Sequence, residues 1–428
     1  MDYLRGLLGM LVLLSVAYAF SSNRKAINWK LVGIGIFLQV IFGILITQVP
    51  QVAQLFRSVS EGFVKFLSFA NDGSKFLFSD LADVPKSGFI FAFQVLPTVI
   101  FFSAVTTGLY YLGILQKVSY GIAWLMAKTM GLSGAESLSA AGNIFLGQTE
   151  APLLVRPFIA KMTTSELMCL MTGGMATIAG SVLGSYVAFL GGADLAKQAE
   201  VAAQLLSASI MNAPAGIVFA KILIPETKPE LIDSELKVNK ETLGANVIDA
   251  LAIGAGEGLK LALNIGAMLL AFIAVIALLN YMLEVVGDWT TLNAIIAEST
   301  NGVFNKLSME YILGQVFRLA AFVIGVEWAD TLQIGSLLGQ KTVINEFVAY
   351  VSLADLQERG LISAKSITIA TFALCGFSNF SSIAIQIGGI GAMAPNQQAN
   401  LSRLGLKALL AATLACMMTA TIAGALLS

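Results

Sequence analysis

The chain has 428 residues, of which 57% are hydrophobic and 12% are charged, whereas about 25% charged residues is ordinary for a soluble domain. Its formal net charge is −1, so no excess of basic residues favours a nucleic-acid partner. The chain contains no histidine, which removes the commonest general base and metal ligand. Its three cysteines, Cys169, Cys375 and Cys416, lie in apolar stretches, and we expect them to pack in the interior rather than to form disulfides or bind a metal.

Apolar runs long enough to cross a bilayer as a helix recur along the whole chain. They lie near 3–20, 31–49, 88–115, 168–190, 201–223, 262–283, 366–394 and 404–427. The sequence therefore predicts an all-α polytopic membrane protein with about eight transmembrane helices. The first run could also be a signal peptide, but it begins after Asp2 with a single Arg and is followed by a second apolar run, so we expect a retained helix.

Basic residues cluster in the segments between these runs, as at Arg24 and Lys25 and again at Arg403 and Lys407. Because cytoplasmic loops carry an excess of Lys and Arg, these clusters place both termini outside the cell. The stretch 50–86 carries charges of both signs among its phenylalanines and is expected to lie at the membrane interface. Its Phe63, Phe66 and Phe69 recur every third residue, which predicts one shared helix face.

Two segments, 133–162 and about 311–352, are apolar at both flanks but polar in the middle. In each, a glycine lies a few residues before a glutamate, Glu150 in the first and Glu346 in the second. Irregular backbone at membrane depth is tolerated only where it faces protein or water. The pattern therefore predicts two re-entrant helical hairpins.

Each predicted hairpin is followed by a span that small and polar residues interrupt, at 173–182 in the first case and at 375–382 in the second. A hairpin, a broken helix and a plain helix thus occur twice. With an odd number of crossings between them, the two copies form an inverted repeat. Paired broken helices in inverted repeats are typical of alternating-access transporters with a binding site at the bilayer midplane.

A glutamate at membrane depth costs on the order of 2.5–3.5 kcal/mol by insertion scales, so Glu150 and Glu346 require a reason. One hypothesis is that both line a hydrated cavity and accept hydrogen bonds from a polar solute. The alternative is that they lie in interfacial loops or pair with Arg156 and Lys341. The repetition of the pattern in both halves favours the first hypothesis.

Three stretches resemble the concentrative nucleoside transporters. They are GQTEAPLLVRP at 147–157, NEFVAY at 345–350 and CGFSNFSS at 375–382. The resemblance covers essentially the whole chain, and these motifs occur in the family's order and spacing. It implies a homotrimer in which each protomer has a scaffold and a mobile transport domain.

On this basis we expect four segments. Residues 1–130 are scaffold helices with an interfacial helix, 131–223 are the first transport repeat, 224–300 are a cytoplasmic linker with a scaffold helix, and 301–428 are the second transport repeat. Each transport repeat comprises a hairpin and two helices, of which the first is broken.

The resemblance also implies a nucleoside site. The base-binding residues are Gln148, Thr149, Glu150, Val182 and Phe377, with Phe377 stacking on the base. The ribose hydroxyls are bound by Glu346, Asn379 and Ser382. This agrees with the chemistry, because an ionised carboxylate accepts the hydroxyl donors of a ribose and an amide both donates and accepts.

In sodium-coupled members of the family, an amide at the first hairpin tip and a hydroxyl in the unwound helix meet backbone carbonyls around the ion. Asn143 and Thr177 match these two positions, with carbonyls near Thr172 and Ile178. Thr177 stands where the family pattern leads us to expect serine, so the hydroxyl is kept and a methyl group is added. Ligation by oxygen alone suits a hard cation such as sodium.

The sequence thus predicts a sodium-coupled nucleoside importer of the bacterial inner membrane, with a proton-coupled carrier of the same fold as the alternative. No organic cofactor is expected. An enzyme is not expected either, because the chain lacks a convincing nucleophile–base pair, metal cluster or phosphate-binding loop. The motifs leave the choice between purine and pyrimidine nucleosides open.

Overall fold

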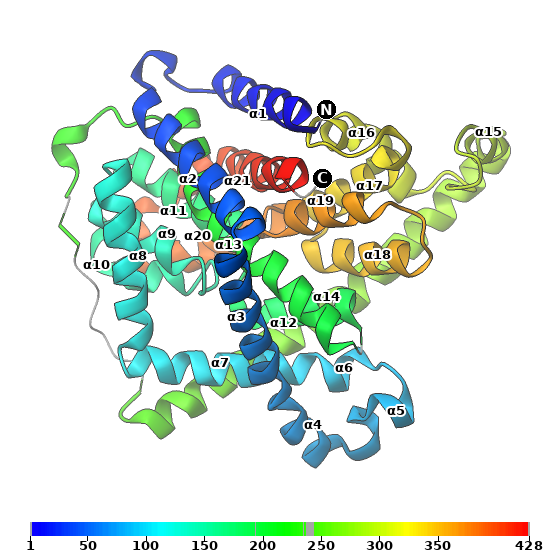
Figure 1. Cartoon of the computed structure of the whole chain (residues 1–428), viewed down its shortest axis with the longest axis horizontal. Coiled ribbons are helices and arrows are strands. Elements are labelled where there is room, and N and C mark those ends of the chain that lie inside the picture. Colours follow the sequence, from blue (N-terminus) through cyan, green and yellow to red (C-terminus); the bar gives the residue numbers. More distant parts are fainter. Residues whose placement is uncertain (1, 193, 234, 237–243, 427–428) are drawn as a thin grey trace.

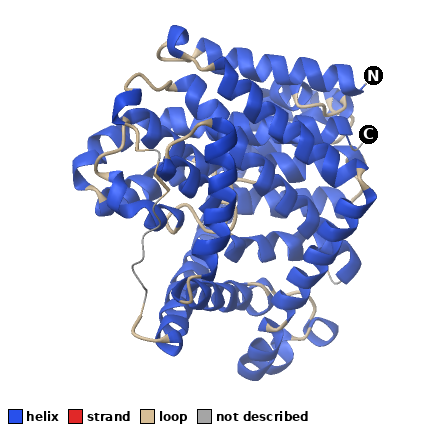
Figure 2. Cartoon of the chain, turned by 60° about the vertical axis from the view of Figure 1, so that its left-hand side comes forward, coloured by secondary structure: helices blue, strands red, loops and turns tan. Residues whose placement is uncertain are grey.

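The computed structural model describes residues 2–192, 194–233, 235–236 and 244–426. Residues 237–243 of the predicted linker lie outside the described residues. All regular structure in the described ranges is helical (Figure 2). The first ten α-helices are α1 (Asp2–Ala19), α2 (Trp29–Gln48), α3 (Pro50–Ser68), α4 (Ala70–Phe78), α5 (Val84–Ser87), α6 (Phe91–Gln94), α7 (Leu96–Tyr111), α8 (Ile114–Met130), α9 (Gly134–Gly142) and α10 (Arg156–Ile159).

The remaining α-helices follow along the chain, and α15 lies at the periphery (Figure 1). They are α11 (Thr164–Ala176), α12 (Gly180–Gly191), α13 (Leu195–Leu223), α14 (Val247–Trp289), α15 (Leu292–Ser299), α16 (Met309–Val323), α17 (Thr331–Val343), α18 (Glu346–Glu358), α19 (Ala364–Leu374), α20 (Phe380–Met393) and α21 (Gln398–Leu426).

Six helical stretches of the described chain are long and apolar enough to cross a membrane. They are Trp29–Gln48, Phe91–Tyr111, Thr164–Gly191, Leu195–Leu223, Val247–Trp289 and Pro395–Leu426. Helix α1 and the pair α19 and α20 are shorter apolar helices, and they account for the other two predicted spans. The predicted all-α polytopic fold is confirmed.

The two repeats have the same order of elements. In the first, α9 is followed by a turn, the 3-10 helix Ala151–Val155 and α10, then by the broken helix α11–α12 and the long α13. In the second, α17 and α18 are followed by the broken helix α19–α20 and the long α21. Helices α13 and α21 have 29 residues each. The chain therefore builds one motif twice, as the interrupted apolar runs predict.

The second hairpin is shorter than its sequence suggests. Its arms are α17 and α18, whereas most of the first part of the predicted range 311–352 forms the separate helix α16. The chain leaves α16 through Gly325, whose φ of 106° lies in the left-handed region that favours glycine. Helix α16 then packs against α17 at Gly314 and Gly335. Its apolar face resembles that of a hairpin arm, which explains the difference.

The two broken helices meet at the centre of the molecule. The first break begins at Thr177, whose extended backbone (φ −112°, ψ 169°) ends α11. The backbone N–H of Phe377, in the second break, donates to the Thr177 carbonyl at 3.2 Å. Gly376 permits this approach, because a Cβ there would lie 2.7 Å from the Ala176 carbonyl oxygen and 2.6 Å from Cys416 Sγ.

One side chain from each long helix satisfies the carbonyls that the breaks expose. Asn212 of α13 donates to the carbonyls of Ala176 and Cys375 at 2.8 and 2.7 Å. Cys416 of α21 donates to the same two carbonyls at 3.4 and 3.5 Å. Orphan carbonyls at helix ends need such partners when they are buried. The four helices are thus joined through one polar centre.

The long helix α14 lies against α7 (Figure 1). A Cβ on Gly254 would lie 2.6 Å from Thr107 Oγ1, and one on Gly258 would lie 2.8 Å from the Ile100 Cα. Glycines four residues apart let two membrane helices approach closely. Helices α7 and α14, both within the predicted scaffold segments, therefore form a tightly packed pair.

The predicted interfacial stretch 50–86 forms α3, α4, α5 and a 3-10 helix. The Phe66 ring packs on the Phe101 and Phe102 rings of α7, and Phe63 contacts Phe102. Phe69 does not share this face. It lies beyond the end of α3 and is exposed, because a spacing of three residues drifts around a helix of 3.6 residues per turn.

The two ends of the described chain lie at the same end of the molecule (Figures 1 and 2). Helix α1 packs on α21, where a Cβ on Gly6 would lie 2.7 Å from the Ala425 Cβ. The prediction that both termini face the same side requires this arrangement. All three cysteines are free and buried, as their apolar surroundings in the sequence indicate.

Candidate functional site

Each hairpin tip docks on the broken helix of the other repeat. At the first tip, Gln148 Nε2 donates to Ser382 Oγ of α20 at 3.1 Å, and Gln148 Oε1 accepts from Gln386 Nε2 at 3.2 Å. At the second tip, Glu346 Oε1 accepts from the hydroxyl of Tyr186 of α12 at 3.1 Å. Each repeat therefore completes the polar surroundings of the other repeat's tip.

Glu346 is the first residue of α18, directly after the N-cap Asn345. Its residue exposure is only 3%, and its Oε2 accepts from Asn379 Nδ2 at 2.8 Å in addition to the Tyr186 bond on Oε1. The partial positive charge of a helix N-terminus stabilises a carboxylate at this position. A carboxylate oxygen accepts more than one hydrogen bond, so Glu346 retains acceptor capacity for a solute.

Asn379 and Ser382 are placed by the start of α20. Asn379 is the N-cap, and its Oδ1 accepts from the Ser382 backbone N–H at 2.8 Å and from Ser381 Oγ at 2.7 Å. This leaves the Asn379 amide nitrogen directed at Glu346. The structure therefore brings together Glu346, Asn379 and Ser382, the three residues predicted to bind ribose, in one buried cluster.

The residues predicted to bind the base are less closely joined. Gln148 belongs to the same cluster through Ser382, whereas Glu150 accepts from the Gly147 N–H at 2.9 Å and is half-buried. No hydrogen bond within the described ranges connects Glu150 to Glu346.

The other base-binding candidates lie on different elements. Thr149 is exposed at the tip beside Gly389, Val182 is buried in α12, and Phe377 is half-buried at the second break. The structure thus brings the ribose candidates together more tightly than the base candidates.

Asn143 lies at the end of α9 with 1% of its surface exposed. Within the described part of the chain, neither its side-chain nitrogen nor its side-chain oxygen has a hydrogen-bond partner. A Cβ on Gly173 would lie 3.0 Å from Asn143 Nδ2, so this amide lies against α11 shortly before that helix ends. Such a buried, unpartnered oxygen is what a ligand to a cation requires.

The other predicted ion ligands lie at the same helix end. Thr177 Oγ1 donates to the Gly173 carbonyl at 2.9 Å, and the buried hydroxyl of Thr172 has no partner among the described residues. Ile178 is buried in the break itself. Amide, hydroxyl and carbonyl oxygens in one place suit a hard monovalent cation, so the residues fit a sodium ion.

The alternative that the two glutamates serve only as partners of basic side chains is not supported for Glu346. The Lys341 ammonium donates to the Ala373 carbonyl at 2.8 Å, and the hydrogen bonds to the Glu346 carboxylate come from Tyr186 and Asn379.

Sequence reasoning missed Tyr186 and Gln386. The Tyr186 ring stacks on the Tyr350 ring with centroids 4.3 Å apart, and Gln386 also donates to the Met171 carbonyl at 3.0 Å. Both are polar side chains inside apolar helices. A buried tyrosine hydroxyl normally has a hydrogen-bond partner. The sequence therefore indicates that Tyr186 needs a partner, but it does not indicate which residue that partner is.

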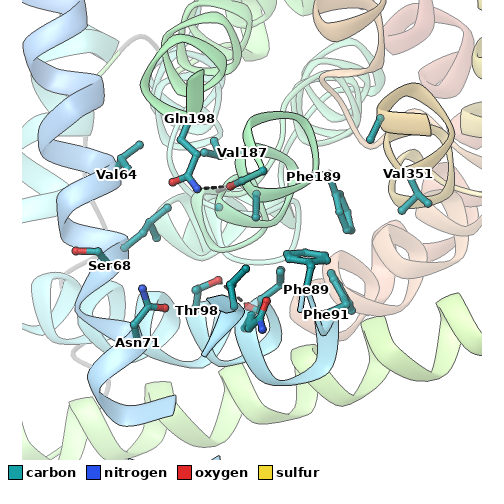
Figure 3. Close-up of a pocket in the computed structure, with 18 of the residues that line it drawn as sticks. Val64, Ser68, Asn71, Phe89, Phe91, Thr98, Val187, Phe189, Gln198 and Val351 are labelled. Carbon is teal, nitrogen blue, oxygen red and sulfur yellow. Dashed lines mark hydrogen bonds between the residues drawn. The ribbon is translucent and has the colours of Figure 1, made fainter. Parts of the chain in front are cut away.

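The described part of the chain also encloses a cavity of about 1070 Å³ (Figure 3). Residues of α3, α6 and α7 line one wall, and residues of α12, α13 and α18 line the other. Phe91 and Phe189 stack across it with ring centroids 5.2 Å apart. None of the predicted site residues lines this cavity, which lies between the two groups of helices.

Three family descriptions match consecutive parts of the chain. They are "Na+ dependent nucleoside transporter N-terminus" over 8–81, "Nucleoside recognition" over 92–193 and "Na+ dependent nucleoside transporter C-terminus" over 204–424. A protein of Haemophilus influenzae described as an uncharacterized transporter is 44% identical over 99% of this chain and 98% of its own length. Sodium/nucleoside cotransporter 1 of Mus musculus is 39% identical over 98% of this chain and 63% of its own length.

Solved structures show the same fold. CNTnw in an inward-facing substrate-bound state is 41% identical with a TM-score of 0.89, covering 100% of this chain and 98% of that chain. A variant of CNTnw in an intermediate state gives a TM-score of 0.90 at 41% identity, with coverage of 100% and 99%. Outward-facing structures of CNTnw variants also match. Because the matches span nearly its whole length, this chain, a multi-pass membrane transporter and not an enzyme, belongs to the concentrative nucleoside transporter family.

Proposed function

We propose that the chain imports nucleosides across the bacterial inner membrane together with sodium, with both termini in the periplasm. A mobile transport domain, formed by 131–223 and 301–428, alternates between the two sides of the membrane. The scaffold, formed by 1–130 and 224–300, stays in place. The cavity between α3, α6 and α7 on one wall and α12, α13 and α18 on the other leaves room for such a movement.

One observation carries this proposal. Glu346, Asn379, Ser382 and Gln148 form a buried polar cluster that draws on both repeats. Glu346 and Asn379 bind the ribose hydroxyls, with Ser382 beside them, because a vicinal diol donates two hydrogen bonds that a carboxylate accepts well. A deoxy analogue leaves buried partners unsatisfied and should bind more weakly.

The base lies toward the first tip. Gln148, Thr149 and Glu150 hydrogen-bond its polar edge directly or through water, Val182 contacts it, and Phe377 stacks on its face. Gln148 and Gln386 bond one another across the repeats, so a base that bonds to Gln148 competes with this contact.

Sodium is the second cargo, held by Asn143, Thr177 and the carbonyls near Thr172 and Ile178. Roughly 2.3 kcal/mol per charge at 100 mV, with about 1.4 kcal/mol from a tenfold sodium gradient, supplies about 3.7 kcal/mol per ion. A single ion then supports a nucleoside accumulation of several hundred-fold, which is adequate for scavenging.

Uptake of radiolabelled uridine and adenosine into proteoliposomes tests this function. An inward sodium gradient should drive accumulation, and replacing sodium by choline should abolish it. Uptake in choline that follows an imposed pH gradient would instead establish the proton-coupled alternative, in which a buried carboxylate carries the proton. Comparison of the two substrates also defines the base preference.

Replacing Tyr186 by Phe should raise the KM for uridine about 10-fold with little change in kcat. The ring keeps its stacking on Tyr350, but one hydrogen bond to the charged Glu346 is lost, and about 1.4 kcal/mol corresponds to tenfold. The matched control is Tyr350→Phe, which removes a hydroxyl that donates to the Thr371 carbonyl at 2.8 Å instead. Equal effects of the two variants on KM would contradict the assigned role of Tyr186.

Replacing Asn143 by Ala should raise the sodium concentration for half-maximal uptake at least about 10-fold, because one oxygen ligand is removed. The same variant should lose the sodium-dependent rise in melting temperature that ligand binding to the folded state produces. Asn23→Ala, at an exposed position between α1 and α2, should change neither quantity. Undiminished sodium dependence in Asn143→Ala would remove this residue from the ion site.

The active form is proposed to be a homotrimer. Cross-linking of membranes that contain the chain should therefore give a limiting species of three subunits.

A further inference from the structure

Both broken helices end inside the molecule, α11 at Ala176 and α19 at Leu374. The C-terminal end of a helix carries a partial negative charge of roughly half an elementary charge. Neither described helix has a basic residue in its own last turn. Asn212 and Cys416 donate to carbonyls at both breaks, but neither brings a positive charge, so any compensating cation comes from another part of the structure.

In the second repeat this charge is a lysine. Lys341 lies in the last turn of α17 and is only 3% exposed. Its Nζ donates to the Ala373 carbonyl at 2.8 Å, one residue before α19 ends. A buried ammonium is costly unless it is paired with negative groups, and here the carbonyl end of α19 provides such a group.

The first repeat has no such lysine at the equivalent place. The N-caps of α11 and α19 are Thr163 and Ser363, so Gly173 and Ala373 occupy the same position, ten residues after their caps. Asn143 Nδ2 lies beside Gly173, 3.0 Å from where a Cβ on that residue would stand, and the Lys341 ammonium donates to the Ala373 carbonyl. Both come from the last residues of the first hairpin arm.

The two equivalent places differ in one respect. Lys341 brings its own positive charge, whereas Asn143 brings a neutral amide whose oxygen has no partner among the described residues. Among the described residues, the carbonyl end of α11 therefore has oxygen ligands but no fixed cation. The carbonyl end of α19 has a fixed cation.

We propose that Lys341 is a tethered cation that takes, in the second repeat, the place that the coupling ion takes in the first, so that one sodium ion accompanies each nucleoside. This inference rests on the proposed sodium site at Asn143. It explains why only one of two related helix ends recruits an ion from solution. Removing the ammonium should create a site that a small external cation can fill.

The first test measures melting temperature in detergent, without transport. Lys341→Ala should melt at least 5 °C below the unaltered chain, and 100 mM methylammonium chloride should restore more than half of that loss. Lys341→Met lacks the charge but fills the space, so methylammonium should not restore it. Choline chloride at the same concentration, which is too large for the site, controls for ionic strength and should have no effect on either variant.

Two results would overturn the inference. One is a melting temperature of Lys341→Ala equal to that of the unaltered chain. The other is a lowered melting temperature of Lys341→Ala that methylammonium does not restore, or restores equally in Lys341→Met. The sodium-dependent shift of the unaltered chain is recorded in parallel. Its absence would refute the sodium site alone, whereas selective rescue by methylammonium would still support the tethered cation.

A second test uses the unaltered chain and therefore does not depend on the folding of a variant. With the membrane potential clamped at zero, a tenfold outward-directed uridine gradient should be balanced by a tenfold inward-directed sodium gradient if one ion is coupled. Two coupled ions would need only about a threefold gradient, because the contributions of the ions add. Balance at threefold would overturn the inference.

The reciprocal exchange places the charge in the first repeat. Asn143→Lys should show a melting temperature that no longer depends on sodium, since the ammonium occupies the carbonyl end of α11. A retained sodium-dependent shift in folded Asn143→Lys would contradict the equivalence of the two places. Should this variant fail to fold, the Lys341 series and the gradient balance decide the question.

Discussion

Glu346→Gln is expected to lower uridine uptake about 100-fold at subsaturating substrate. Both carboxylate oxygens of Glu346 accept hydrogen bonds, from Tyr186 and from Asn379. A glutamine keeps one acceptor oxygen but places an N–H₂ group against one of these two donors. Hydrogen bonds to a charged group contribute about 1.5–3 kcal/mol each, and about 2.7 kcal/mol corresponds to 100-fold. Initial rates of radiolabelled uptake in proteoliposomes measure the effect.

The control for this variant is Glu298→Gln, at an exposed position of α15. It makes the same chemical change without touching the buried cluster, and its uptake should equal that of the unaltered chain. The Glu346→Gln protein should also remain folded, which its elution from a sizing column reports. Normal uptake by folded Glu346→Gln would remove this residue from the ribose site.

Lys221→Met is expected to cost about 3–5 kcal/mol of stability, the usual range for breaking a buried ion pair by removal of one partner. Lys221 of α13 forms an ion pair with Glu136 of the first hairpin and donates to Ser165 Oγ of α11 at 3.0 Å. Both charged side chains are almost fully buried. Without the ammonium, Glu136 is left as an uncompensated charge. Thermal unfolding in detergent should show a melting temperature lower by roughly 3–6 °C.

Two further variants separate the charge from the shape of the side chain. Lys86→Met breaks the exposed pair with Asp80 and should leave the melting temperature unchanged, because surface pairs contribute little. The double variant Lys221→Met with Glu136→Leu should recover most of the loss, since an apolar pair can replace a buried ion pair. A double variant as unstable as Lys221→Met would show that the loss does not come from the unpaired carboxylate.

The duplicated architecture could be predicted because each break interrupts an apolar run with glycines and polar residues. Glu346 and Asn379 are 33 residues apart in the sequence, yet their motifs predicted that both belong to one site. In the structure Asn379 Nδ2 donates to Glu346 Oε2 at 2.8 Å. The start of the second hairpin was predicted wrongly. Helix α16 has an apolar face of its own, and the turn at Gly325 and the short 3-10 helix Trp328–Asp330 separate it from α17.

Contacts between distant residues were not accessible to sequence reasoning. Asn212 lies in the middle of an apolar helix, and nothing in its neighbourhood indicates that its amide caps the ends of two other helices. The same holds for Tyr186, whose partner is 160 residues away. A polar residue in an apolar helix indicates that a hydrogen-bond partner is needed, but the identity of that partner depends on how the helices pack.

The docking of each tip on the opposite repeat has a consequence for biosynthesis. Gln148 bonds to Ser382, which is 234 residues later in the chain. At a translation rate of about 5–20 residues per second, roughly 10–50 s pass between the synthesis of these two residues. During that interval the first tip has entered the membrane without its partner, so hydration or the insertion machinery must shield it until the last helices emerge from the ribosome.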